Sequence, residues 1–325
     1  MTTKNKVLSF LEKNRGVYLS GAKMAESLNI SRNAVWKAIK QLEKEGFEIE
    51  AVTNKGYSLS TKSNQMSEVG IKEHLPEQLK EQDIYYFEQI NSTNKKAKEL
   101  ASHGANHGTL IVANEQTAGS GRYGRVFESP KDSGIYMSMI LKPDEMFLKD
   151  PTLITAYAAV IVSNVIESMT GKKVGIKWVN DLFLDGKKVC GILTEAVTNF
   201  ESGQIEWIVV GIGINLTTSS HDFSEEVRKK AGALLEEKVS ISRNDLVARI
   251  FKDFMLPNEQ MSVENVMKEY KEKSIILNKR VLIQQGKEEL LCLIKDIDNQ
   301  GQLVIQKDSG EISTFNSGEI RVVVN

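Results

Sequence analysis

The sequence predicts an α+β protein of several domains: an amino-terminal winged helix-turn-helix, a central domain with a mixed β-sheet, and a small carboxy-terminal β-barrel. Apolar residues at helical spacing form short runs before Gly46, strand-like and helix-like runs alternate from about Ile84, and short alternating strands follow Lys279. At 325 residues the chain is long enough for two or three domains. We expect boundaries at residues 1–62, 66–275 and 276–325, with a polar linker over 60–68.

Three short helices are expected in the first domain. The first ends at Asn14-Arg15-Gly16, Ser20 can cap a second over 21–28, and Ser31 can cap a third. Two short helices joined by a tight turn, the second with a polar outer face, are typical of a helix-turn-helix. In the third helix the residues at core spacing are Val35, Ile39 and Leu42.

Alternating residues on either side of the turn Asn54-Lys55-Gly56 predict a two-stranded wing. Residues 1–62 carry eleven Lys and Arg against six Glu, a net +5, which leaves −6 on the rest of a chain of net charge −1. Arg and Lys suit phosphate or guanine contacts, and Asn suits adenine. We expect DNA binding; the alternative is a three-helix packing or protein-interaction domain. The candidate contact residues are Ser31, Arg32, Asn33, Trp36, Lys37, Lys40 and Lys55.

The central domain alternates strand-like and helix-like runs. Asp185-Gly186 is a hairpin turn, so the sheet is not expected to be all parallel. Strands are predicted at 84–87, 109–114, 135–141, 174–178, 182–184, 189–196 and 205–214. Helices are predicted at 93–101, 153–169, 223–235 and 243–254.

Residues 119–124 match the dinucleotide-binding pattern G-x-G-x-x-G, but a loop that leads to another strand follows them, where that pattern requires a helix. The Rossmann interpretation therefore fails. What remains is a glycine-rich loop with Arg122 and Arg125, which can wrap an anion or be an ordinary surface loop.

Two further segments suggest chemistry. Lys177 lies at the end of an apolar strand next to Asn180 and Asp181, where it could pair with that carboxylate or serve a phosphate or carboxylate ligand. Residues 210–215 form an apolar strand with two glycines, which permit close approach of a ligand or of another backbone. The alternative is a bulge or tight packing against a helix.

Composition excludes several classes of protein. The longest apolar run, Ile154 to Ile166, looks too short and too interrupted to span a bilayer, and no secretory signal is visible, so a cytoplasmic location is expected. Cys190 and Cys292 are expected to be buried, reduced thiols. The four histidines show no metal-ligand spacing, and no metal ligands are assigned.

Taken together, the motifs resemble the biotin–protein ligase family, in its bifunctional class that also represses transcription. The resemblance covers essentially the whole chain, and the ordered set is more specific than any one motif. The motifs are Ser92-Thr93-Asn94, Glu115-Gln116 followed by Gly119 to Arg125, Lys177 to Asp181, Lys188 to Gly191, and Gly211 to Asn215.

The resemblance implies a central ligase domain like that of class II synthetases, an SH3-like terminal barrel, and a two-step reaction. ATP and biotin give biotinyl-5′-AMP, with Mg²⁺ expected alongside ATP, and the adenylate then biotinylates a lysine of biotin carboxyl carrier protein. It also implies operator DNA as a partner, the adenylate as corepressor, and a homodimer when the adenylate is bound.

The resemblance also implies a role for individual residues. Lys177 and Arg122 would be the catalytic cations. Ser92, Thr93, Asn94 and Gln116 would bind the ureido end of biotin. Ser120, Gly121, Arg122 and Arg125 would belong to the loop that orders over the adenylate. Phe127 and Asn215 would lie near the adenine.

Three positions depart from the family pattern, which has Arg at Ser120, Trp at Phe127 and Pro at Val179. The loss of a cation at Ser120 keeps one alternative open, a biotin-sensing repressor with weak or lost ligase activity. A lipoate-type ligase is a further alternative, which the winged helix and the terminal barrel disfavour.

Overall fold

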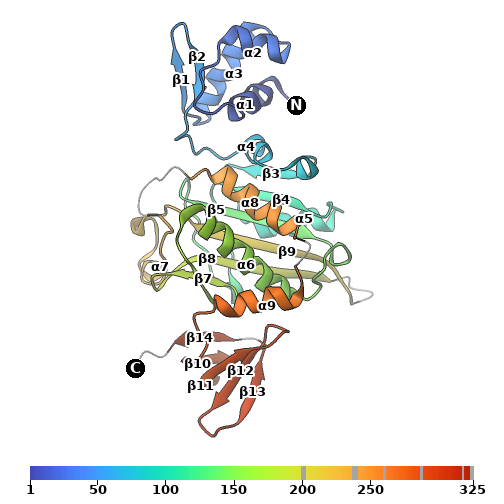
Figure 1. Cartoon of the computed structure of the whole chain (residues 1–325), viewed down its shortest axis with the longest axis vertical. Coiled ribbons are helices and arrows are strands. Elements are labelled where there is room, and N and C mark those ends of the chain that lie inside the picture. Colours follow the sequence, from blue (N-terminus) through green and yellow to red (C-terminus); the bar gives the residue numbers. More distant parts are fainter. Residues whose placement is uncertain (199–202, 236–240, 259–260, 286–287, 317, 323–325) are drawn as a thin grey trace. The chain divides into compact units, whose positions relative to one another are not determined.

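The computed structural model describes residues 1–325 except 199–202, 236–240, 259–260, 286–287, 317 and 323–325. The chain forms two compact units (Figure 1). One comprises residues 1–86 and 237–252, and the other comprises residues 87–236 and 253–325.

The first unit contains the predicted winged helix-turn-helix. Each of the first three helices has an N-cap side chain that accepts a backbone N–H, and the apolar residues of all three share one buried core. The wing strands pair in antiparallel register across the turn at Asn54 to Gly56. The elements are α1 (Thr3–Glu12), α2 (Gly21–Leu28), α3 (Arg32–Lys44), β1 (Ile49–Val52) and β2 (Gly56–Leu59).

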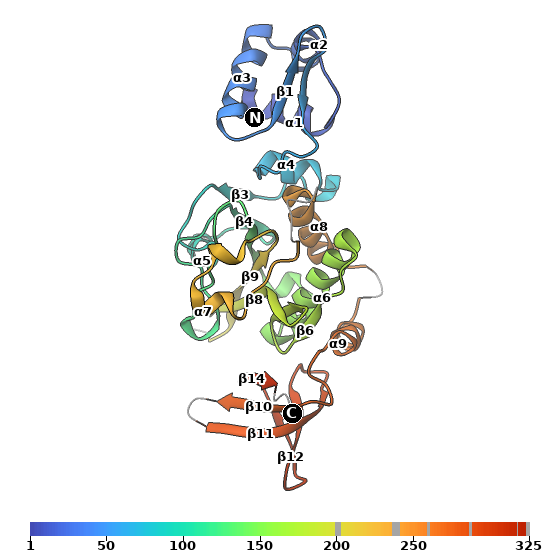
Figure 2. The same cartoon turned by 90° about the vertical axis from the view of Figure 1, so that its left-hand side faces the viewer.

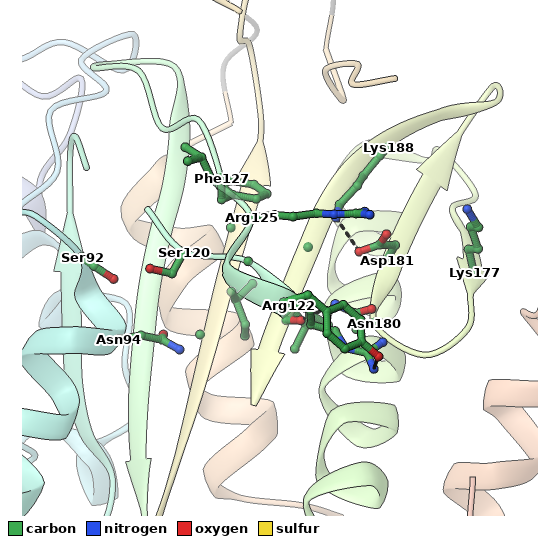
Figure 3. A pocket seen from close by; sticks show the side chains of 18 of the residues that line it. Ser92, Asn94, Ser120, Arg122, Arg125, Phe127, Lys177, Asn180, Asp181 and Lys188 are labelled. Atoms are coloured by element: carbon green, nitrogen blue, oxygen red, sulfur yellow. Dashed lines mark hydrogen bonds and ion pairs between the residues drawn. The ribbon is translucent and has the colours of Figure 1, made fainter. Parts of the chain in front are cut away.

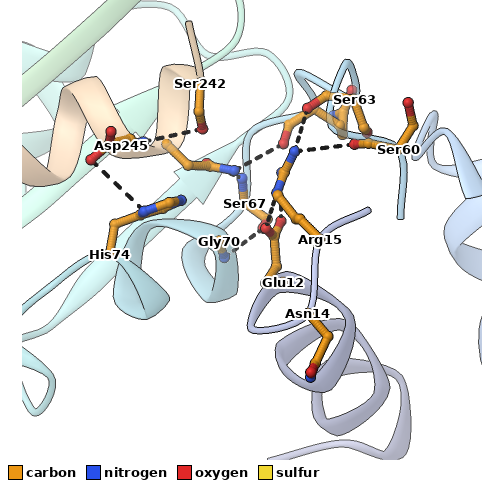
Figure 4. Close-up of polar contacts among 12 residues, drawn as sticks. Glu12, Asn14, Arg15, Ser60, Ser63, Ser67, Gly70, His74, Ser242 and Asp245 are labelled. Atoms are coloured by element: carbon orange, nitrogen blue, oxygen red, sulfur yellow. Dashed lines mark hydrogen bonds and ion pairs between the residues drawn. The ribbon is translucent and has the colours of Figure 1, made fainter. Parts of the chain in front are cut away.

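The segment expected as a linker is held by polar contacts within this unit (Figure 4). The guanidinium of Arg15 donates to the carboxylate of Glu12 and to the carbonyl of Ser63. Asn244, only 1 % exposed near the start of α8 (Arg243–Met255), accepts the N–H of Ser67, the N-cap of α4 (Glu68–Glu73). Residues 60–67 are therefore tied to α1 and α8 by side-chain hydrogen bonds.

The central sheet has seven strands in the order β3-β4-β5-β9-β8-β7-β6, and the strands from β4 to β6 lie in the second unit. From β4 to β6 every neighbouring pair is antiparallel, and Asp185-Gly186 forms the predicted hairpin turn between β7 and β8. The strands are β3 (Ile84–Phe87), β4 (Thr109–Ala113), β5 (Gly134–Leu141), β6 (Gly175–Lys177), β7 (Asp181–Leu184), β8 (Lys187–Thr198) and β9 (Ile205–Asn215).

Helices α5 (Thr93–Ser102) and α6 (Pro151–Thr170) cover opposite faces of this sheet (Figure 2). Thr194 of β8 bonds to Thr155 of α6, while the next residue, Glu195, bonds to α5. Successive strand residues point to opposite faces, so this pair of contacts identifies the two faces. Residues of β5 are buried throughout because both faces are covered.

We expected the apolar run from Ile154 to Ile166 to be too short to span a bilayer, and helix α6, which contains it, corrects this expectation. Its 20 residues are long and apolar enough to cross a membrane by length and composition, but 67 % of its apolar window is buried inside the protein. Of the described helices it alone meets that test. A core helix that packs on a sheet accounts for the composition.

The helix predicted over 223–235 is wrong beyond its first turn. Helix α7 (Glu225–Arg228) ends early, and the following backbone bonds to strands instead: Gly232 to Lys188, and Leu234 to Asn215. Tertiary hydrogen bonds replace helical ones there. The short helix α4 and helix α9 (Val263–Glu272) were not predicted.

The carboxy-terminal strands form a five-stranded antiparallel sheet of order β13-β12-β11-β10-β14. Within the described residues no pairing joins β13 to β14, so the order is that of an open sheet. The predicted turn at 285–287 falls outside the described residues at 286 and 287. The strands are β10 (Arg280–Gln285), β11 (Glu288–Ile297), β12 (Leu303–Lys307), β13 (Ile312–Phe315) and β14 (Glu319–Val322).

Candidate active site

One pocket in the second unit collects most of the predicted site residues. It lies over β8 and β9, between the N-terminus of α5 and the glycine-rich loop. Ile320 of β14 and Gly318, just before that strand, also line it. The predicted residues that line it are Ser92, Thr93, Asn94, Gln116, Ser120, Gly121, Arg122, Arg125, Phe127 and Lys177. Asn215 lies just beyond, two residues past Gly213 on β9.

At one end of the pocket the start of α5 is locked in a neutral polar network. Ser92 is the N-cap of the helix. The Oε1 atom of Gln116 accepts from the backbone N–H of Thr93 at 2.8 Å and from its hydroxyl at 3.1 Å. The buried hydroxyl of Ser138 lies 2.7 Å from Thr93 Oγ1 and 2.6 Å from Asn94 Oδ1. These groups hold acceptors and donors in fixed positions, as a site for an uncharged polar ring requires.

The glycine-rich loop is a small hairpin. Ser120 pairs with Val126, and Gly121 donates its N–H to the carbonyl of Arg125 at 2.7 Å. The turn at its tip has positive φ at Tyr123 (56°) and Gly124 (73°). The guanidinium of Arg122 lies over the exposed ring of Tyr123, 5.0 Å from its centroid. The hairpin carries both arginines along the edge of the pocket.

Lys188 contributes to a cationic end of the pocket, although the sequence predicted no role for this residue. Lys188 of β8 lies 2.5 Å from Asp181 of β7, and Figure 3 shows this pair facing Arg125. Lys177 lies on the outer strand, with its ammonium 5.4 Å from the centroid of the Phe183 ring. The carboxylate of Asp181 is therefore paired with Lys188.

A β-bulge explains how Lys188, which belongs to a family motif but was given no role, reaches the pocket. Phe183 pairs with Lys188 but Leu182 pairs with Cys190, so Val189 is an extra residue in β8. In a regular strand Lys188 and Gly191 would point to opposite faces, yet both line the pocket. The sequence offers only a lysine before Val-Cys-Gly, which carries no sign of a bulge.

Close packing against glycines shapes the floor of the pocket. A Cβ at Gly213 would lie 2.5 Å from the ring of Phe127, and one at Gly191 would lie 3.1 Å from the same ring. A Cβ at Gly211 would overlap Oδ1 of Asn94. The expected close approach to β9 is therefore made by two side chains of the chain itself.

Asn215 and Cys190 are buried beside the pocket, and the structure indicates the hydrogen bonding of the first and the protonation of the second. Asn215, 3 % exposed, donates to the carbonyl of Gly232, and in the described part of the chain its Oδ1 atom has no hydrogen-bond partner. Burial raises the pKa of the Cys190 thiol, which therefore stays protonated and unreactive.

The described residues contain no group of three or more His, Cys, Asp or Glu side chains placed to hold a metal ion.

The candidate DNA-binding residues lie in the first unit. Arg32, Asn33, Trp36, Lys37 and Lys40 are all exposed along one side of α3. Ser31 uses its hydroxyl to cap this helix, and Lys40 pairs with Glu43 at 2.7 Å. In the wing, Lys55 lies 5.7 Å from the centroid of the Tyr18 ring.

Comparison with known families matches three consecutive segments of the chain. Residues 3–58 match an HTH domain, residues 86–215 match the biotin/lipoate A/B protein ligase family, and residues 276–322 match the biotin protein ligase C-terminal domain. The chain belongs to the biotin–protein ligase family. Its three segments follow the order that the motifs predicted.

Among its relatives, the bifunctional ligase/repressor BirA of Bacillus spizizenii is 45 % identical over 67 % of this chain and 66 % of that protein. The chain thus aligns with slightly less than two thirds of that relative's length. The protein of the same name from Escherichia coli is 28 % identical over 94 % of this chain and 93 % of its own length. The structure of the Aquifex aeolicus biotin protein ligase in complex with biotin and ATP is 25 % identical, with a TM-score of 0.63, and covers 75 % of this chain and 99 % of that one.

Proposed function

We propose that the chain is a bifunctional biotin–protein ligase and biotin-responsive repressor. The observation that carries this proposal is a single pocket with a neutral polar end at Ser92 to Asn94 and a cationic end at Arg122, Arg125, Lys177 and Lys188. The first end suits an uncharged ureido ring, and the second suits a carboxylate and phosphates that react with one another. The Bacillus and E. coli relatives bear both functions in their names.

The proposed reaction has two steps. A carboxylate oxygen of biotin attacks the α-phosphorus of ATP, the α–β phosphoanhydride bond breaks, and pyrophosphate leaves. The amine of a lysine on biotin carboxyl carrier protein then attacks the acyl carbon, AMP leaves with the electron pair of the acyl–oxygen bond, and the amine loses a proton. The first step brings together two anions, so fixed cations lower its barrier.

Residue roles follow from position and charge. Lys188 and Arg125 would offset charge at the reacting phosphate, with Arg122 on the same loop and Lys177 at the outer strand. The free Oδ1 of Asn215 would accept an amino N–H of the adenine, and the ring of Phe127 offers an aromatic face. Ser120 and Gly121 would bring the loop backbone to the adenylate.

Mg²⁺ would be held by ATP phosphates together with Asp181, the one carboxylate among the described lining residues. When bound, it would neutralise charge on the pyrophosphate. Asp181 already pairs with Lys188, so the protein itself supplies few ligands.

The repressor half rests on the exposed polar side of α3 and the wing. A twofold operator would need two winged helices, hence a homodimer in the adenylate-bound state.

We also propose the domain boundaries 1–62, 66–275 and 276–325, an SH3-like form for the terminal sheet, a class II synthetase-like central domain and a cytoplasmic location. The three family matches support the boundaries, and two buried free cysteines fit a reducing compartment.

The ligase half predicts a covalent product. Full-length protein incubated with biotin, ATP, Mg²⁺ and a biotin carboxyl carrier domain should raise the carrier's mass by one biotinyl group. A carrier with Arg at the acceptor lysine is the control and should gain nothing. Tight biotin binding without any mass gain would instead support the sensing repressor without ligase activity.

Lys188 is expected to matter more than Lys177. Lys188→Met should slow pyrophosphate release at least about 100-fold, because it removes a fixed cation from the reacting phosphate. Lys177→Met, the matched variant, should slow it by less than about tenfold, since its ammonium lies at the edge of the site. Equal losses, or a larger loss for Lys177→Met, would return the catalytic role to Lys177.

Ser120→Arg should restore a cation to the loop and tighten biotin binding at least about tenfold, a gain of about 1.4 kcal/mol. Isothermal titration calorimetry without ATP, so that no adenylate forms, measures this affinity. Ser120→Met adds length without charge and should leave the affinity nearly unchanged. An unaltered affinity in Ser120→Arg would show that Arg122, Arg125 and the two lysines already saturate the site.

The exposed polar side of α3 predicts a complex with DNA whose affinity depends on the salt concentration. Twofold-symmetric duplexes enriched from a random pool, with biotin and ATP present, should bind with an affinity that falls steeply as salt rises. Lys37→Ala should reduce the slope of log K against log[salt] by about 0.9 for each phosphate that the lysine no longer neutralises. Lys6→Ala, an exposed lysine on α1, should not change the slope. Failure to enrich any duplex would contradict the repressor half alone.

A further inference from the structure

The carboxylate of Glu195, outside the pocket, is hydrogen-bonded to the side chain of Asn94, which lines the pocket. Glu195 lies in the middle of β8, on the face covered by α5, and does not line the pocket. Its Oε2 atom accepts from Nδ2 of Asn94 at 2.9 Å, and its Oε1 atom accepts from the ammonium of Lys98, one turn later in α5, at 2.7 Å. The carboxylate therefore bridges two residues of the helix that starts at the pocket.

The contacts of Asn94 fix the orientation of its amide. Its side-chain NH₂ group donates to Glu195 and to the carbonyl of Leu193 at 3.3 Å, while Oδ1 accepts from Ser138. A flipped amide would place its oxygen against a carboxylate and a carbonyl, and its NH₂ group against the Ser138 hydroxyl. Two acceptor–acceptor contacts in a residue that is 5 % exposed are costly, so the flip is suppressed.

The fixed orientation points the acceptor toward the pocket floor. Oδ1 lies over Gly211, which lines the pocket, so closely that a Cβ at that glycine would overlap it. A carbonyl oxygen has two lone pairs, and Ser138 uses one of them. Among the described residues Ser138 alone donates to this oxygen, so the remaining lone pair is available to a ligand N–H or O–H.

We propose that Glu195 is a positioning residue for ligand selection: it holds Asn94 with its oxygen toward the pocket, so that the site accepts an N–H of the ligand. This inference rests on the proposed function, in which the ligand is biotin. The ureido ring of biotin carries N–H groups, and a ring whose nitrogen is alkylated lacks the donor. Glu195 thereby sets selectivity for an unsubstituted ureido ring without touching the ligand.

The test compares equilibrium binding of biotin and of N-methyl-ureido biotin to the full-length protein by calorimetry. Glu195→Ala should weaken biotin binding about 10-fold or more, because the amide is then free to flip and a charge-assisted hydrogen bond is removed. Binding of the methylated analogue should change less than about twofold, since that ligand never used the acceptor. The selectivity ratio between the two ligands should therefore fall about 5-fold or more.

Two further variants separate positioning from a merely structural role. Lys98→Met removes the other partner of Glu195 and leaves the Asn94 contact, so its selectivity ratio should match that of the unmodified protein. Glu195→Gln keeps the shape and can still accept from Asn94, and should give an intermediate ratio. It also serves as the test if Glu195→Ala fails to fold. Equal weakening of both ligands by Glu195 variants would overturn the proposal.

Asn94→Ala distinguishes failure of this inference from failure of the proposed site. If Asn94→Ala lowers the selectivity ratio and neither Glu195 variant does, Glu195 has no positioning role and the proposed biotin site stands. If Asn94→Ala also leaves the ratio unchanged, the ureido ring binds elsewhere, and the proposed site fails together with the inference. If the unmodified protein binds no biotin, the proposed function itself is wrong.

Discussion

The candidate site depends on the close approach of two side chains to the backbone of one strand. Asn94 and the ring of Phe127 rest on Gly211 and Gly213 of β9 at distances that leave no room for a Cβ atom. Any larger residue at either glycine would push away the start of α5 or the end of the glycine-rich loop. Since those two segments carry the polar end and the loop of the pocket, the two glycines fix the distance between the two halves of the site.

The charge distribution at the pocket follows from a local irregularity of the sheet. The extra residue in β8 at Val189 turns Lys188 to the pocket side, where it meets Asp181 from the neighbouring strand. This pairing keeps a lysine ammonium at a fixed position before any ligand arrives. A cation held in place by the scaffold stabilises developing negative charge better than one that must reorganise.

Strand β8 contacts helices on both faces of the sheet. Thr194 bonds to α6, Glu195 bonds to α5, and the preceding residues reach the pocket. These contacts come from consecutive residues of one strand, so β8 anchors α5 on one face of the sheet and α6 on the other. In the first unit, buried Asn244 and Arg243 play a comparable part by holding the segment that follows the wing.

Local sequence was enough to predict the winged helix-turn-helix and the alternation of strands and helices in the central region, because periodicity, caps and turns are local properties that the folded chain retains. Most residues of the pocket were predicted through the resemblance to the biotin–protein ligase family. Ser20 and Ser31 cap helices as expected, and Asp185-Gly186 forms the predicted hairpin turn. Residues 231–235 were misassigned because their hydrogen bonds go to distant strands. That Lys188 joins the site and that Glu195 orients Asn94 emerges only from the folded chain, since a bulge and contacts between residues about a hundred positions apart leave no local pattern.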